Sequence, residues 1–260
     1  MSQLIPGLVS VTFRSRSPEE IIGLAIKAGL KTIEWGGDIH VPHGDVARAG
    51  EVGRLTRKTG LSVAAYGSYY RLGFSETNGL SFAQVLDSAV ALGAPTIRVW
   101  AGHKGSHEMS PLERGAVIAD AFRIANLAQA HGVTISLEYH PGTLTDTRDS
   151  VQQLMKEMAR PDLEFLWQPE HGETVERNLA RLRDVIPRLR HIHVGYLEPS
   201  VSDRRVLAEG RERWRHYLKI IQDTGKVVPC LLEFVRNDST EQFFQDAATL
   251  CNWLGKNVQL

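Results

Sequence analysis

The chain has 260 residues, of which 42% are hydrophobic and 23% charged, a composition that excludes dominant disorder. Thirty Lys and Arg residues balance thirty Asp and Glu residues, which argues against nucleic acid or an anionic membrane as the main partner. The two cysteines form no CxxC motif, and the sequence contains neither a secretory signal pattern nor a long apolar run. We therefore expect a cytoplasmic protein with one domain over residues 1–260.

Short β-rich runs and helical segments alternate along the chain. Several helical segments end at a glycine that opens the next run, which is typical of a helix followed by a buried parallel strand. The predicted strands are 7–13, 28–35, 59–66, 92–100, 131–139, 162–167, 189–194 and 224–234. The predicted helices are 18–28, 45–59, 81–92, 111–131, 147–158, 174–186, 211–223 and 240–254.

Strict alternation of strand and helix predicts a parallel sheet, and eight units in this length favour a closed α/β (β/α)8 TIM barrel. The alternative is an open doubly wound sheet. That fold usually has a glycine-rich phosphate loop after its first strand, and neither GxGxxG nor GxxxxGK[ST] occurs here.

Polar residues end four consecutive predicted strands. Active sites of such barrels lie at the carboxyl ends of the strands, where Glu138, Gln168, His193 and Glu233 would meet. Their mixed oxygen and nitrogen donors would suit a divalent metal. Each glutamate could instead pair with a neighbouring Arg or Lys, and each histidine could be a hydrogen-bonded core residue, so both interpretations stay open.

With these residues in place, the sequence resembles the xylose isomerase-like TIM-barrel superfamily. The resemblance rests on Glu34-Trp35-Gly36, RVWAGHKGS (98–106), LEYHPGTLTDT (137–147), Gln168-x-x-His171, His193 and Glu233. It implies one divalent ion, Mn, Mg, Co or Zn, held by a Glu, an Asp, a His and a Glu. Gln168 stands where the family usually has Asp, which removes one negative charge and predicts weaker metal binding.

The resemblance leaves three functions open. The leading interpretation is a metal-dependent isomerase or epimerase of a ketose or polyol, in which Glu138 and Glu233 exchange a proton through an enediolate. The alternatives are a dehydratase of the dehydroshikimate or inosose type that also uses His140, and a non-catalytic barrel that binds a small metabolite.

The expected partner is a small sugar or hydroxy-carbonyl compound, and relatives also suggest a homo-dimer or tetramer. Arg98, His103 and Lys104 are candidates for holding a carboxylate, and Arg204 and Arg205 lie in a long polar loop that could close over the substrate. The complete set of candidate substrate contacts is Trp35, His40, Arg98, His103, Lys104, His171, Arg204 and Arg205.

Overall fold

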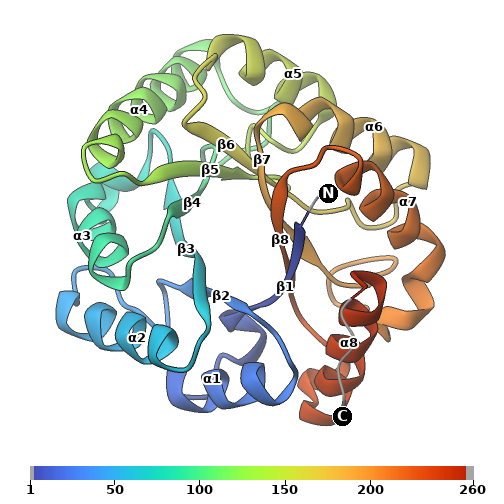
Figure 1. Ribbon diagram of the computed structural model, residues 1–260. Helices are drawn as coiled ribbons and strands as arrows, with labels where there is room; N and C mark the ends of the chain where they lie inside the picture. Colours follow the sequence, from blue (N-terminus) through green and yellow to red (C-terminus); the bar gives the residue numbers. More distant parts are fainter. Residues whose placement is uncertain (1–2, 256–260) are drawn as a thin grey trace.

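The computed structural model describes residues 3–255 and forms a closed parallel barrel in which β1 to β8 follow one another in chain order. Figure 1 shows the ring of strands with the helices around its outside. The strands are β1 (Gln3–Val9), β2 (Thr32–Gly36), β3 (Ser62–Arg71), β4 (Thr96–Trp100), β5 (Thr134–Glu138), β6 (Leu163–Trp167), β7 (Leu189–Val194) and β8 (Val227–Leu232). The predicted fold class is confirmed.

Within residues 3–255, eight α-helices alternate with the strands. They are α1 (Pro18–Lys27), α2 (Val46–Lys58), α3 (Phe82–Leu92), α4 (Pro111–Gln129), α5 (Arg148–Glu157), α6 (Val175–Val185), α7 (Arg211–Gln222) and α8 (Thr240–Trp253). The first predicted strand, 7–13, is shifted: β1 ends at Val9, and residues 10–13 form a short 3-10 helix.

Capping residues explain where the helices begin. Ser17 and Ser110 each accept a hydrogen bond from the backbone three residues later, and a glutamate at that position bonds back, with proline at the first helical position. At the carboxyl end of α3, Gly93 has φ +76°, a backbone conformation that is favourable mainly for glycine. These local signals fix the length of each unit and hence the strand order.

The main apolar core lies between the strands and the helix ring, where Ile33, Ile97, Val99 and Leu137 are fully buried. The inside of the barrel is polar instead, because the alternate residues Glu34, Arg98 and Ser136 point there. Within residues 3–255, none of the helices is long and apolar enough to cross a membrane. The polar interior leads directly to the candidate site.

Candidate functional site

A cavity of about 630 Å³ opens at the carboxyl ends of the strands. Its wall includes strand-end residues, residues of the loops that follow β5 and β6, and residues of the loop between β7 and α7. The lining residues used below are Tyr69, Arg98, Trp100, Glu138, His140, Gln168, His171, Glu233 and Phe234. The cavity is large enough for a small metabolite.

Beneath the cavity, a fully buried carboxylate organises the barrel interior. Glu34 accepts hydrogen bonds from Arg98 Nε at 2.8 Å, His191 Nε2 at 3.0 Å and His193 Nε2 at 3.1 Å. Burial acts to raise the pKa of Glu34, but the neighbouring His193 and Arg98 hold it well below its usual value. Glu34 is therefore an anion compensated on all sides, as a buried charge must be.

A glycine on β3 makes room for this ion pair. A Cβ at Gly67 would lie 2.6 Å from Arg98 Nη2 and 2.8 Å from Glu34 Oε1. Any side chain there would displace the guanidinium or the carboxylate.

Glu138 is the second partner of Arg98. Its Oε2 accepts from Arg98 Nη1 at 2.5 Å and from Trp100 Nε1 at 2.5 Å, while its Oε1 accepts from Gln168 Nε2 at 3.2 Å. Gln168 Nε2 also donates to the Tyr139 carbonyl at 2.8 Å, which sets the amide orientation. Three N–H donors thus surround one carboxylate, and the Gln168 carbonyl oxygen is left for a ligand.

His193 joins the interior network to the cavity. Its Nε2 faces Glu34, whereas its Nδ1 lies 3.2 Å from Glu233 Oε2 and 3.9 Å from Glu138 Oε1. Nδ1 is buried and has no hydrogen-bond partner by geometry within the described part of the chain. Burial acts to lower the pKa of His193, but Glu233 and Glu34 raise it to about 10. In the metal-free protein His193 therefore carries a positive charge and faces carboxylates through both ring nitrogens.

His140 lies beside this cluster. Its ring stacks on Trp100, with centroids 4.2 Å apart and planes at 27°. Nδ1 lies 2.6 Å from the Pro141 carbonyl and donates to it, because a carbonyl only accepts; in the neutral ring the lone pair is therefore on Nε2. In the neutral form, Nε2 of His140 is thus available to accept a proton, and stacking on Trp100 orients the ring.

The structure brings together part of the expected site. Glu138, His140, Gln168, His171, Glu233 and Arg98 line the cavity, and His193 contacts Glu233 from below. Arg98 pairs with Glu34 through Nε and with Glu138 through Nη1, so it holds Glu138 in place.

Other expected substrate contacts lie outside the cavity lining. Trp35 is fully buried in the core behind the strands, and His40 bonds to Ser10 Oγ at 2.9 Å. His103 stacks on Phe74, while Lys104 pairs with Glu113 at 2.6 Å.

Arg204 and Arg205 tie down the loop after β7. Arg204 pairs with Asp238 and lies over the ring of Phe234, 4.4 Å from its centre, and Arg205 Nε donates to the Glu198 carbonyl at 2.8 Å. They hold the loop that forms one wall of the cavity, which includes Pro199, Ser200 and Val201.

Sequence reasoning gave Glu34 no role in the site, although the signal was present. Glu34 follows Ile33 and precedes Trp35, so it is an acidic residue inside an apolar strand, the same pattern that singled out Glu138. Arg181 and Asp146 also line the cavity, from a helix and a loop. No strand-end pattern could have identified those two.

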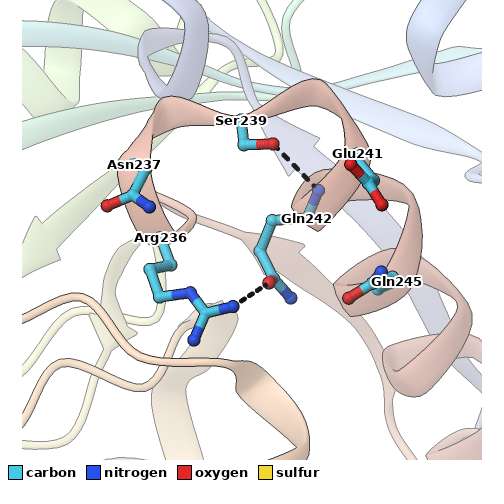
Figure 2. A pocket seen from close by; sticks show the side chains of 6 residues that line it. All are labelled: Arg236, Asn237, Ser239, Glu241, Gln242 and Gln245. Atoms are coloured by element: carbon cyan, nitrogen blue, oxygen red, sulfur yellow. Dashed lines mark hydrogen bonds between the residues drawn. The ribbon is translucent and has the colours of Figure 1, made fainter.

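A second, smaller hollow of about 170 Å³ lies at the start of α8 (Figure 2). Two hydrogen bonds join its lining residues: Arg236 donates to Gln242 at 3.1 Å, and Ser239 accepts from the Gln242 backbone. Among the described residues, no buried cluster of ionisable groups lies in it. The cavity over Glu138 and His193 is therefore the better candidate site.

Comparison with known proteins identifies the same fold as the structure shows. A family model described as "Xylose isomerase-like TIM barrel" matches residues 22–257. This chain belongs to the xylose isomerase-like TIM-barrel family. Metal ions occur among its solved members: a protein of this type from Mycobacterium smegmatis, in complex with magnesium, has a TM-score of 0.75 at 14% identity, over 96% of each chain.

Two of the similar proteins are from Bacillus anthracis, and both are named as 3-dehydroshikimate dehydratases, one of them as a probable one. A 3-dehydroshikimate dehydratase is 36% identical over 101 residues, which is 37% of this chain and 35% of the relative, so the match spans about a third of that protein's length. The crystal structure of a probable 3-dehydroshikimate dehydratase from the same organism has a TM-score of 0.79 at 20% identity, over 96% of this chain and 99% of the other. At 20% identity the structural likeness concerns the fold.

The residues present fit the metal that the family implies. His193 Nδ1 lies 3.2 Å from Glu233 Oε2 and 3.9 Å from Glu138 Oε1, so an imidazole nitrogen and two carboxylate oxygens of the kind that bind divalent metals lie near one another. Glu34, His191 and His193 also lie close enough to hold an ion on the other side of the imidazole. Arg98 pairs with both Glu34 and Glu138, so it lowers the attraction of both positions for a cation. Glu138 and Glu233 line the cavity, whereas Glu34 and His191 do not.

Proposed function

We propose that this protein is a metal-dependent lyase that removes water from a cyclic hydroxy-carbonyl compound, with 3-dehydroshikimate as the first substrate to test. The matched segment of the B. anthracis dehydratase supports this substrate class. The observation that carries the proposal is the contrast between Glu138, which three N–H donors surround, and His140, whose Nε2 is free.

This contrast favours elimination over epimerisation. An epimerase of the kind considered above needs two carboxylates that exchange protons on opposite faces of the substrate. Glu138 is a weak base for that role, because the donors Arg98, Trp100 and Gln168 stabilise its ionised form. Glu233 and His140 remain, and an elimination needs only one group that takes and returns a proton.

In the proposed reaction, His140 Nε2 takes the proton from the carbon next to the carbonyl. The electron pair of that C–H bond forms a carbon–carbon double bond as the bond to the β-hydroxyl breaks. The imidazolium returns its proton to the departing hydroxyl, so one water leaves and His140 is regenerated. Stacking on Trp100 and the bond to Pro141 keep the ring aimed through both transfers.

Glu138, Gln168, His193 and Glu233 would hold the metal, which would polarise the substrate carbonyl and stabilise negative charge on its oxygen. Glu34 can accept the proton on His193 Nε2, so a metal ion that displaces the Nδ1 proton would find a lone pair on Nδ1. Gln168 supplies a neutral oxygen in place of a carboxylate. We therefore propose that the ion is bound more weakly than by a site with three acidic ligands.

The test uses purified protein incubated with Mn²⁺, Mg²⁺, Co²⁺ or Zn²⁺ and followed by NMR in heavy water. We expect 3-dehydroshikimate to lose water and give a conjugated product, and we expect His140→Asn to lose at least a hundredfold in kcat while metal affinity is retained. Ketoses and inososes are tested in parallel. Epimerisation or deuterium uptake in a ketose without loss of water would refute the dehydratase proposal, as would equal activity of His140→Asn.

A further inference from the structure

Trp100, the last residue of β4, contacts both groups on which the proposed reaction depends. Its indole Nε1 donates to Glu138 Oε2 at 2.5 Å, and its ring stacks on His140 at 4.2 Å between centroids. One rigid side chain therefore links a metal-ligating carboxylate to the base. A change of the indole therefore acts on both groups.

Two neighbours fix the indole itself. The guanidinium carbon of Arg71 lies 4.9 Å from the centre of the Trp100 ring, and the ring of Tyr69 meets it edge-on at 5.5 Å. Arg71 and Trp100 are register partners at the ends of β3 and β4, so the sheet places the cation over the indole. A cation over an aromatic face contributes about 0.5–1 kcal/mol at exposed sites and more when desolvated.

The His140 ring needs such a support. Its one side-chain hydrogen bond within residues 3–255, to the Pro141 carbonyl, fixes which nitrogen carries the proton. A single bond leaves the plane of the ring free to rotate about it, whereas a stacked indole restricts that plane. Proton transfer depends steeply on the direction of the lone pair, so the orientation of this ring matters for the proposed reaction.

We propose that Trp100 is a positioning residue that holds His140 in the plane needed for proton transfer and, through its N–H, restrains Glu138 as a metal ligand. The inference rests on the proposed function for the role of His140. The two effects belong to different parts of the indole. They can therefore be removed one at a time.

Trp100→Phe keeps an aromatic surface and removes the N–H, whereas Trp100→Met removes both. We expect both variants to bind Mn²⁺ about tenfold more weakly in calorimetric titrations of metal-free protein, because Glu138 loses a donor that orients it. At saturating metal, we expect kcat within about threefold of the wild type for Trp100→Phe and at least tenfold lower for Trp100→Met. Trp253→Phe, near the end of α8, is the matched control and should change neither quantity.

A spectroscopic measurement separates this inference from the proposed function. The indole should shift the His140 ring protons upfield in the NMR spectrum of the wild type, with the signals assigned by their loss in His140→Asn. The shift should shrink in Trp100→Phe. If the wild type lacks the upfield shift, the stacking is refuted, even where Trp100→Met does not fold.

The remaining outcomes are equally distinct. Wild-type metal affinity in Trp100→Phe would refute the link to Glu138, and equal kcat in the Phe and Met variants would refute the positioning of His140. If the wild type does not dehydrate any tested substrate, the dehydratase proposal fails and the role in turnover falls with it. In that case the NMR shift and the metal titration still test the contacts of Trp100.

Discussion

Replacing Gln168 with aspartate should make the metal-free protein less stable and should increase the affinity of the protein for a divalent metal ion. The change removes the donor to the Tyr139 carbonyl at 2.8 Å and to Glu138 Oε1 at 3.2 Å, and it places a second carboxylate beside Glu138. Two negative charges about 3 to 5 Å apart repel by about 3 to 5 kcal/mol at an effective dielectric constant of about 20. A divalent ion between them reverses that repulsion.

Chelator-treated protein should therefore show a melting temperature lower by about 5 °C or more in scanning calorimetry. Titration with Mn²⁺ should give a Kd at least about tenfold smaller than that of the wild type, a difference of about 1.4 kcal/mol. Gln168→Asn is the control, since it shortens the side chain equally and adds no charge. An unchanged Kd in the aspartate variant would place Gln168 outside the ligand set, and unchanged metal-free stability would mean that the carboxylates are not close.

Two further predictions concern the scaffold. Gly67→Ala should destabilise the protein by about 2–3 kcal/mol in urea unfolding, because its Cβ would meet Arg98 Nη2 at 2.6 Å. Gly115→Ala on α4 is the control: within the described chain its Cβ would meet no atom within 4 Å apart from its chain neighbours and its own helix backbone, so it should be neutral or stabilising. A loss in Gly115→Ala as large as that in Gly67→Ala would contradict this reasoning. Burial raises the pKa of Asp246 to about 6 from 3.8, so the folded state binds its proton more tightly than the unfolded chain and stability falls as pH rises from about 4 to 6. Asp246→Asn should flatten the melting temperature over that range, and a slope equal to that of the wild type would exclude Asp246 as its source.

The fold could be predicted from sequence because its signals are local. Serine caps, prolines at the first helical position and glycines behind the helices each act within a few residues, and eight repetitions of the unit define the barrel. The shift of the first strand is the exception. Residues 10–13 are buried and rich in β-formers, and Ser10 Oγ bonds to the Gly36 backbone, a contact that no local pattern reveals.

The candidate site could be predicted only where strand order determines proximity. Glu138, Gln168, His193 and Glu233 meet because they end neighbouring strands. The partners of Arg98 depend on side-chain reach across the barrel, from β4 to β2 and β5, and strand order alone does not decide which carboxylate a long side chain chooses. His40 follows β2 by a few residues, which suggests a place at the mouth of the barrel. Its ring instead contacts Ser10 and the Phe13 carbonyl.

The polar barrel interior has an evolutionary consequence. A buried set of Glu34, Arg98 and His191 is usually no more stable than well-packed apolar residues of the same volume, and replacing such a set can stabilise a protein. Selection for heat resistance alone would therefore tend to erode these residues together. If these residues persist in a lineage, we infer continued selection on the position of His193, which Glu34 contacts. A relative whose barrel interior is filled with apolar side chains is expected to have lost the proposed activity.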